Sequence, residues 1–234
     1  MKTRRLGIFV FYDQDGIVGN YVYYLLDEIS QWVHHLVIVC NGKLSAEGSE
    51  RFHQYTEDVF VRENSGYDGT AYKEVILNLY GIDKVREFDE LLLFNDSCYA
   101  PMYPFEAVFD KMESDDIDFW GITEYESVSN HIAKHIQAYF ICIHSRMLHS
   151  PEFREFWNTM EPIYEYEDAV RHFEIKFTTY FSENGYHWRT LIGESPYILY
   201  YDGYEMMKYH HCPFVKRKNY TSFAEGALLR GGNV

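Results

Sequence analysis

The stretch Leu91-Leu92-Leu93-Phe94-Asn95-Asp96-Ser97-Cys98-Tyr99-Ala100-Pro101 decides the fold, because an apolar run ends there at three polar residues. A short, continuous apolar segment bounded by turn-forming residues is typical of a strand covered on both faces, as in parallel sheets. We therefore expect Asp96 at the carboxyl end of a central strand. In open α/β sheets that edge binds ligands, because the loops that leave the strands diverge there and open a crevice.

Two interpretations fit the triplet Asn95-Asp96-Ser97. Carboxylate, amide and hydroxyl oxygens are hard ligands, so the triplet suits Mg²⁺ or Mn²⁺ better than a soft metal. The same residue types also form turns and cap helices. The triplet alone does not separate a cation site from a turn, and the functional interpretation needs support from other parts of the chain.

The size and charge of the chain limit its class. Its 234 residues are enough for one α/β domain with a substantial core. The formal net charge of −15 argues against a nucleic-acid partner, since phosphate backbones are bound by clusters of Lys and Arg. Lys216-Arg217-Lys218 is the one basic cluster in the sequence outside the N-terminus. An anionic small ligand remains compatible with the acidic composition if it binds at that cluster.

Cysteine usage and hydropathy indicate the compartment. The four cysteines are widely spaced and form no C-x-x-C pair, which is typical of a reduced, intracellular protein. No signal peptide is recognisable, because residues 1–5 lead into a short strand and a polar turn rather than a sustained apolar segment. No apolar run approaches the roughly eighteen residues that cross a bilayer. We expect a cytoplasmic protein without a transmembrane segment.

Apolar periodicity predicts alternating strands and helices. The first half reads as strands at 6–12, 35–40, 58–62 and 90–94, with helices at 19–32, 45–55 and up to residue 80. Repeated βα units imply a parallel, right-handed, doubly wound sheet. The second half reads as strands at 117–123 and 135–143 and helices at 103–112, 151–160 and 167–182. The glycine-punctuated loop at 62–73 opens a helix, and such loops bring the backbone close to a ligand.

Several segments, in this order, resemble a known family. They are 9–13 (Phe-Val-Phe-Tyr-Asp) with 15–18, 62–68 (Arg-Glu-Asn-Ser-Gly-Tyr-Asp) with 71–73, 95–99 (Asn-Asp-Ser-Cys-Tyr), 118–123 (Asp-Phe-Trp-Gly-Ile-Thr), 135–140 (His-Ile-Gln-Ala-Tyr-Phe), 153–157 and 212–214 (Cys-Pro-Phe). The chain resembles the rhamnan synthesis protein F family over most of its length. In one place it departs from the family's pattern: Gly69-Thr70 stands where Phe-Gly is usual, which puts the donor in question.

The resemblance implies a single GT-A-like glycosyltransferase domain over 1–234, with a mostly parallel sheet flanked by helices. The nucleotide-sugar-binding half would cover about 1–100, and the acceptor half and tail about 101–218. It implies hexose transfer in cell-surface polysaccharide assembly, with dTDP-rhamnose as the first candidate for the donor. The acceptor would be a saccharide or lipid-linked saccharide, and the protein would act at the inner face of the plasma membrane. Whether it stands alone or is one module of a larger assembly stays open.

The resemblance also suggests a cation site for the leaving diphosphate. Asn95-Asp96-Ser97 occupies the place of the Asp-x-Asp motif of GT-A enzymes, which implies Asp96 as principal ligand of Mg²⁺ or Mn²⁺. His210 and His211 are candidates for closing the site, since GT-A folds often place a C-terminal His there. Lys216, Arg217 and Lys218 are candidates for binding the diphosphate. A surface histidine pair and a solvated basic tail are the competing interpretations.

The remaining roles are divided between donor, acceptor and proton transfer. The donor residues are Asp13, Asn64, Gly66, Asp68, Lys73, Asn95 and Ser97, besides Lys216 and Arg217. Inverting transfer needs a general base, for which we predict Glu174, with Asp168 as the reserve. Trp120, Gly121 and Thr123 are predicted to shape the acceptor pocket, although a core tryptophan fits the same sequence.

Two further functions compete with a transferase. A non-catalytic nucleotide-sugar-binding or scaffold subunit is consistent with the single carboxylate of the triplet and with the change at 69–70. A zinc hydrolase would use His131 and His135, which have i, i+4 spacing. That pattern needs a Glu beside the first histidine, and Ile132 stands there. Turnover of a nucleotide sugar separates the transferase from the scaffold.

Overall fold

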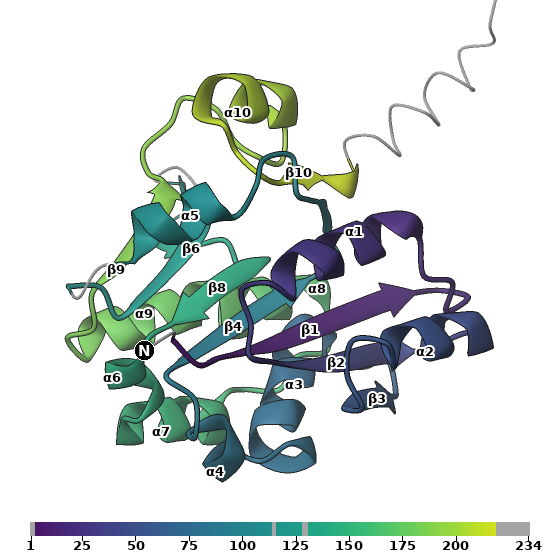
Figure 1. Ribbon diagram of the computed structural model, residues 1–234. Helices are drawn as coiled ribbons and strands as arrows, with labels where there is room; N and C mark the ends of the chain where they lie inside the picture. Colours follow the sequence, from purple (N-terminus) through teal and green to yellow (C-terminus); the bar gives the residue numbers. More distant parts are fainter. Residues whose placement is uncertain (1–2, 114–115, 128–130, 219–234) are drawn as a thin grey trace, which may run out of the picture.

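The structure is a computed structural model that describes residues 3–113, 116–127 and 131–218 (Figure 1). Its centre is an eight-stranded mixed sheet with the order β3-β2-β1-β4-β8-β6-β7, and β9 pairs with β6. The strands are β1 (Arg5–Asp13), β2 (His35–Gly42), β3 (Val59–Arg62), β4 (Glu90–Asn95), β6 (Phe119–Ser127), β7 (Ile132–Ile136), β8 (Phe140–Ile143) and β9 (Trp188–Ile192). A second, small sheet joins β5 (Cys98–Tyr99) and β10 (Val215–Lys216).

The direction of the strands brings the carboxyl ends of six of them to one edge. β1 is parallel to β2 and β4, and β2 is parallel to β3. β8 is antiparallel to both β4 and β6, so β6 runs in the same direction as β4. β9 is parallel to β6, and the carboxyl ends of β1, β2, β3, β4, β6 and β9 therefore share the edge that we call the carboxyl edge. The predicted α/β class with a mostly parallel sheet flanked by helices is confirmed.

Helices cover both faces of the sheet (Figure 1). One face packs on α1, α2, α5 and α10, and the other on α3, η1, α4, α6, α7, η2 and α9. Their bounds are α1 (Asn20–Ile29), α2 (Ala46–Phe52), α3 (Tyr67–Glu74), η1 (Val75–Leu79), α4 (Ile82–Val85), α5 (Glu106–Met112), α6 (Ser145–Leu148), α7 (Pro151–Thr159), α8 (Tyr166–Asp168), η2 (Ala169–Ile175), α9 (Lys176–Glu183) and α10 (Gly203–His210). The leucines of β4 are fully buried, as expected for a strand covered on both sides.

The sequence predicts one strand at 135–143, whereas the structure has two strands there. β7 and β8 pair with different parts of β6, and residues 137–139 between them leave the sheet. The N–H of Gln137 still donates to the main-chain oxygen of Thr123 (2.9 Å), so the interruption is a local bulge. This bulge turns the Gln137 and Tyr139 side chains toward the carboxyl edge, where both line a cavity.

The predicted helix at 167–182 is confirmed, but its middle is unusual. α8, η2 and α9 follow one another without a break, and η2 is a π-helical segment. π-Helical turns widen a helix and are frequent at functional sites. Glu174 lies in this segment. Phe173, Phe177 and Phe181 bury one face of the helix, as their spacing predicts.

The state of the cysteines and the hydropathy of the helices both bear on the environment of the chain. All four cysteines are free and buried, consistent with their behaving as small apolar residues. Among the helices that the structure describes, none has the length and hydropathy that crossing a membrane requires.

Candidate active site

Two cavities lie next to each other at the carboxyl edge. The larger one, of about 840 Å³, is lined by the ends of β1 and β2, the segments after β3 and β4, and the C-terminal tail. The smaller one, of about 180 Å³, is lined by α3, η2 and the bulge at 137–139. Tyr67, Asp68, Ser97 and Lys218 line both. We therefore treat the two as the large and the small compartment of one site.

Most of the predicted donor residues meet in the large compartment. Those that line it are Asp13, Asn64, Gly66, Asp68, Ser97 and Arg217, and Asp96, predicted as the metal ligand, lines it as well. Asp13 is fixed by its own loop, since its Oδ1 accepts hydrogen bonds from the N–H groups of Asp15 (3.0 Å) and Ile17 (2.9 Å). Residues from β1, the loop after β3 and the end of β4 are thus brought together, as the strand directions require.

The loop after β3 is braced by Arg62. Its guanidinium donates to Asn41 Oδ1 (2.6 Å) and to the main-chain oxygen of Ser65 (3.0 Å), and it pairs with Glu74 (2.6 Å). Gly66 precedes α3 with a φ of +71°, in the left-handed region that favours glycine. The buried β2 end and α3 therefore hold this loop in a defined shape beside the large compartment.

Asp96 follows β4 at the carboxyl edge, as the sequence predicts. Its carboxylate is 11% exposed, and Oδ2 accepts hydrogen bonds from the Tyr21 hydroxyl (3.0 Å) and from the Arg217 guanidinium (2.5 Å). Arg217 also donates to the main-chain oxygen of Asp96 (2.9 Å). Burial raises the pKa of Asp96, while the positive charge of Arg217 opposes that shift. The residue is thus a buried carboxylate whose counter-charge comes from the C-terminal tail.

Asp68 is a second carboxylate in the same site. Its Oδ2 accepts a hydrogen bond from Asn95 Nδ2 (2.6 Å), and Asn95 Oδ1 in turn accepts one from the N–H of Ser97 (3.0 Å). Burial, and next the negative charge of Asp96, raise the pKa of Asp68 to about 7. The site therefore carries a carboxyl group that changes its charge near neutral pH.

The C-terminal tail is attached to the carboxyl edge by β10, which pairs antiparallel with β5 (Figure 1). The ring of Phe214 stacks on Phe105 with centroids 5.4 Å apart, and the N–H of Arg217 donates to the main-chain oxygen of Ser97 (3.2 Å). Lys216 Nζ donates to the Ser97 hydroxyl (3.1 Å). The tail thereby places three consecutive cationic residues along the site, since Lys216 and Lys218 line the small compartment and Arg217 and Lys218 the large one.

Glu174 faces the small compartment from the π-helical segment. Its Oε1 lies 3.4 Å from Nε2 of the buried His135. Nδ1 of His135 is 2.7 Å from the main-chain oxygen of Ala133, and because that oxygen can only accept, Nδ1 carries a proton. The imidazole is therefore oriented with Nε2 toward the Glu174 carboxylate, to which it can donate when the imidazole carries both protons. Of the acids predicted for proton transfer, Glu174 is the one in contact with the site.

Tyrosines supply much of the wall of the small compartment, which the sequence did not reveal. Tyr139, Tyr166 and Tyr200 line it together with Gln137. Thr123 Oγ1 donates to Gln137 Oε1 (2.8 Å) and lies 2.8 Å from the Tyr139 hydroxyl. Thr123, predicted to contact the acceptor, thus acts behind two residues that line the compartment. Aromatic faces beside hydrogen-bonding groups are a usual surface for a sugar ring.

The other two predicted acceptor residues lie inside the fold. Trp120 is 1% exposed, and the register pairs it with Cys142 toward the opposite edge of the sheet. Its indole N–H donates to His144 Nε2 (3.1 Å). A Cβ at Gly121 would lie 2.2 Å from Ile136 Cγ2, so glycine is required for packing there. The acceptor role predicted for Trp120 is corrected to a core role, because the strand begins too far from the carboxyl edge for its early residues to reach the site.

Four more predicted residues have partners away from both compartments. The His210 ring is 3.0 Å from the Ser195 hydroxyl, and His211 packs edge-on against Tyr103. Lys73 Nζ donates to the main-chain oxygen of Met160 (3.0 Å), which ties α3 to the end of α7. Asp168 caps α8, and backbone N–H groups lower the pKa of its carboxyl. The structure therefore does not bring these four to Asp96.

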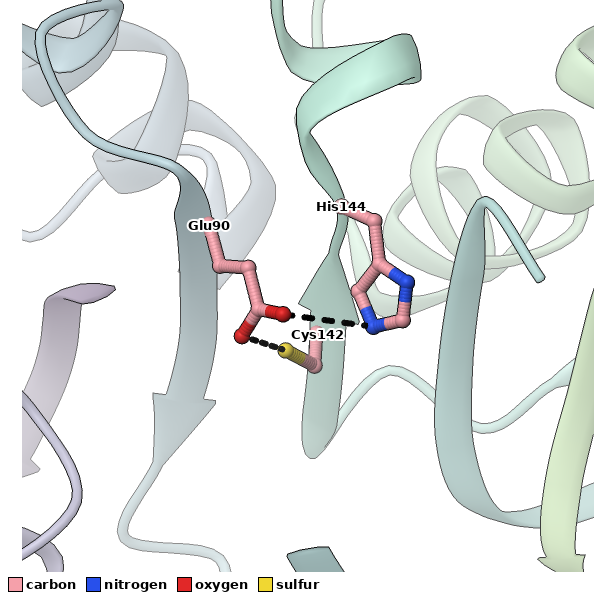
Figure 2. A group of neighbouring side chains, drawn as sticks. All are labelled: Glu90, Cys142 and His144. Carbon is pink, nitrogen blue, oxygen red and sulfur yellow. Dashed lines mark hydrogen bonds and ion pairs between the residues drawn. The ribbon is translucent and has the colours of Figure 1, made fainter. Parts of the chain in front are cut away.

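A group with metal-ligating side chains occurs at the other end of β4. Glu90, Cys142 and His144 point toward one another in Figure 2. Glu90 already pairs with the Arg5 guanidinium (Nε to Oε2, 2.7 Å), and His144 Nε2 accepts from the Trp120 indole. Since each polar atom has a partner from the chain, this cluster fits a buried hydrogen-bond network better than a metal site.

The donor set at Asp96 also fits a divalent cation poorly. Mg²⁺ and Ca²⁺ bind carboxylate oxygens at about 2.0–2.6 Å, which is the distance at which Arg217 approaches Asp96 Oδ2. The Ser97 hydroxyl is bound to Lys216 and the Asp68 carboxyl to Asn95. The carboxylate predicted as the metal ligand and the neighbouring side-chain oxygens of Ser97 and Asp68 therefore already accept hydrogen bonds from donors of the chain.

The fold is that of an α/β protein with two adjoining cavities at the carboxyl ends of parallel strands. The family model described as Rhamnan synthesis protein F matches residues 36–230. The match covers more than half of the sequence, and the chain belongs to this family. It is also 24% identical over 184 residues to the uncharacterized protein y4gN of Sinorhizobium fredii, covering 77% of this chain and 46% of that protein. The chain thus spans about half the length of this relative.

Solved structures of similar shape include a glycosyltransferase and a synthase. One is a glycosyltransferase involved in glycosylation of the major capsid of PBCV-1, with 11% identity, a TM-score of 0.42 and coverage of 90% of this chain and 94% of that chain. The other is 4-diphosphocytidyl-2C-methyl-D-erythritol synthase from Anaerococcus prevotii, with 9% identity, a TM-score of 0.49 and coverage of 83% and 88%. At these scores neither likeness bears on the function of this chain.

Proposed function

We propose that this chain is a GT-A-type glycosyltransferase that moves a hexose from a nucleotide-sugar donor to a growing cell-surface polysaccharide, with inversion at the anomeric carbon. The observation that carries the proposal is the pairing of a large compartment, lined by strand-end polar groups and cations, with a small compartment that contains Glu174. dTDP-rhamnose is the first donor to test, since the family is described by rhamnan synthesis. We place the reaction at the cytoplasmic face of the plasma membrane, on a saccharide or lipid-linked acceptor.

In this proposal the nucleotide occupies the large compartment. Asp13 and Asn64 are positioned for the hydroxyls and base of the nucleoside, and the diphosphate lies toward Arg217 and Lys218. The sugar then enters the small compartment, where Tyr166 offers an aromatic face. We orient the nucleotide sugar in this way because the cations, which bind phosphate groups, lie where the two compartments meet.

Glu174 acts as the general base. It takes the proton of the acceptor hydroxyl while that oxygen attacks the anomeric carbon and the bond from this carbon to the diphosphate oxygen breaks. In its doubly protonated form His135 donates from Nε2 to this carboxylate and orients it, which makes His135 a positioning residue. The electron pair of the broken bond leaves with the nucleoside diphosphate, whose charge the nearby lysines and arginine offset.

The departure from the family pattern at 69–70 is a packing change. A Cβ at Gly69 would lie 2.8 Å from Ile163 Cδ1 and 2.9 Å from Phe173 Cβ, so these two side chains fill the space above the glycine. A phenylalanine at 69 would have to displace them. The change therefore alters the wall of the small compartment, which Gly69 and Phe173 line and where the sugar is expected, and through Ile163 it also reaches the wall of the large compartment.

A transfer assay tests the proposal. Purified protein is incubated with dTDP-rhamnose or UDP-hexoses and a saccharide acceptor extract, and transfer is followed with a radiolabelled sugar. Glu174→Gln should retain nucleotide binding and lower transfer by about 10²-fold or more, the usual loss for a general base. Glu183→Gln is the matched control and should retain transfer, because Glu183 lies at the end of α9, which continues the helix of Glu174, and lines neither compartment. Near-normal transfer by Glu174→Gln would place the base elsewhere.

The same assay decides the second candidate, a non-catalytic nucleotide-sugar-binding subunit. The observation that favours it is the single carboxylate of Asn95-Asp96-Ser97, already paired with Arg217. Such a subunit would bind nucleoside diphosphates in calorimetry and yet transfer no sugar to any acceptor. Transfer that depends on Glu174 would exclude it.

A further inference from the structure

Arg217 occupies the position on Asp96 that a metal ion would need. The guanidinium lies 2.5 Å from Oδ2 and also donates to the main-chain oxygen of the same residue. The carboxylate is 11% exposed and the arginine 29% exposed, so this pair is shielded from water on most sides. A divalent cation could bind Oδ2 only after Arg217 had moved, and the displaced guanidinium would lose a charge-assisted hydrogen bond.

Each of the three tail cations also lies over a tyrosine ring. Arg217 is 4.4 Å from the centre of the Tyr21 ring, and Lys216 Nζ is 4.7 Å from that of Tyr139. Lys218 Nζ is 5.5 Å from the Tyr166 ring. Cation–π contacts of this length stabilise partly desolvated cations and restrict where they lie. Lys216 and Arg217 are half-buried and Lys218 is exposed, so the first two are held in place within the site while Lys218 stays in contact with solvent.

These charges are distributed along the site as a diphosphate requires. Lys216 reaches the small compartment, Arg217 the large one, and Lys218 both. Lysine and arginine groups bind phosphate oxygens by charge-assisted hydrogen bonds, and arginine can do so in a bidentate manner. The overall charge of −15 makes the concentration of three cations at this edge more distinctive.

We propose that this chain supplies the counter-charge of the diphosphate itself and binds nucleoside diphosphates without a divalent cation. Arg217 neutralises Asp96 in the free protein, and Lys216, Arg217 and Lys218 together neutralise the diphosphate in the complex. The inference rests on the proposed function, since it specifies how that site recognises its donor. It replaces the sequence-based expectation of Mg²⁺ or Mn²⁺ at Asp96.

Calorimetric titration with UDP and dTDP tests this inference, first in excess EDTA and then with Mn²⁺. Both conditions should give dissociation constants for the wild-type protein within about threefold of each other, less than 1 kcal/mol. Binding that requires Mn²⁺ would overturn the inference while leaving the proposed function intact. Binding of neither nucleotide in either condition would overturn the proposed function, and this inference with it.

Variants of the tail identify the groups responsible. Arg217→Gln and, separately, Lys216→Met should weaken UDP binding in EDTA about tenfold or more, the scale of a lost hydrogen bond to a charged group. Lys208→Gln removes an exposed lysine of α10 outside both compartments and should bind as the wild type does. Should Arg217→Gln fail to fold, the double variant Asp96→Asn/Arg217→Gln avoids the unpaired buried carboxylate. Wild-type affinity in EDTA for the lysine and arginine variants would overturn the assignment.

Discussion

The two ends of β4 each hold a buried carboxylate paired with an arginine, but their surroundings differ. At the start of the strand Glu90 pairs with Arg5, and their side chains are 12% and 10% exposed. At its end Asp96 pairs with Arg217, which is 29% exposed and lines the large compartment. The first pair lines a separate cavity of about 180 Å³ together with Trp32, Phe109 and Trp120. We call these the closed end and the open end.

The difference shows that the capacity of such a cluster to bind a ligand depends more on its exposure and on the direction of the strands than on its residue types. Both ends contain a carboxylate, an arginine and further polar groups, and the closed end even has the better set of soft metal ligands in Figure 2. The strand directions place loops at the open end, where the chain can leave space for a ligand. At the closed end the same groups satisfy one another, which makes them part of the core.

Removing the arginine at the closed end should have the largest effect on stability. Arg5→Met leaves Glu90 buried without its partner and also removes a cation–π contact to Phe109 (4.3 Å). We expect a loss of about 3–5 kcal/mol in the free energy of urea unfolding. The double variant Arg5→Met/Glu90→Leu should recover most of it, because apolar replacement of both partners is close to neutral. A single variant as stable as the wild type would contradict a structural role.

The next largest effect is the pH dependence of stability that Asp68 should give the open end. The folded pKa of Asp68, about 7, lies above its ordinary value of 3.8, so the folded state keeps a proton that the unfolded state releases between pH 4 and 7. The unfolded state binds fewer protons in that window, and stability should therefore fall as pH rises through it and level off above. Relative to the wild type, Asp68→Asn should gain about 2–4 kcal/mol of stability between pH 4 and pH 7.

The exposed Glu63, in the loop that precedes α3, provides the control for the Asp68→Asn experiment. Glu63→Gln should show the wild-type dependence of unfolding free energy on pH. If Asp68→Asn and Glu63→Gln gave the same profile, the buried carboxyl at the open end would not be the titrating group.

The arginine at the open end should matter less for stability than its counterpart. Arg217→Met removes the partner of Asp96, but water in the large compartment can reach the carboxylate once the guanidinium is gone. We expect a loss of about 1–2 kcal/mol in urea unfolding, within the range for a hydrogen bond to a charged group. A loss as large as that of Arg5→Met would remove the distinction between the open and the closed end.

The smallest effect concerns the thiol at the closed end. Cys142 Sγ lies 3.7 Å from Glu90 Oε2, a weak contact, and Cys142→Ala should cost about 1 kcal/mol. Added Zn²⁺ should leave the melting temperature of both proteins unchanged. A Zn²⁺-dependent rise that Cys142→Ala abolishes would show that Glu90, Cys142 and His144 bind metal after all.

Much of the fold could be predicted because the sequence carries it locally. The run at 91–94 predicts a buried strand, and the position of Asp96 at its carboxyl end follows from that alone. Loop residues such as Asn64 and Gly66 follow from glycine and turn chemistry after a strand. These inferences need only one strand and the direction of its neighbours.

The rest depends on contacts between distant segments. Trp120 and Thr123 are three residues apart on β6, yet its register with β8 makes the first a core residue and sets the second behind Gln137 and Tyr139. The pairing of Arg217 with Asp96 joins positions 121 residues apart and depends on β10 docking on β5. No local pattern specifies either arrangement, so the sequence alone leaves both an acceptor role and a core role open for Trp120 and does not predict the partner of Asp96.

A crystal structure with bound dTDP or UDP, grown without divalent ions, tests the central claim most directly. We predict the nucleoside between Asp13 and Asn64 in the large compartment and the diphosphate in hydrogen-bond contact with Arg217 or Lys216. A nucleotide bound outside this compartment would contradict the proposed site. If density appears only after Mn²⁺ is added, with the ion on Asp96 and Arg217 displaced, the site would stand and the counter-charge would belong to the metal.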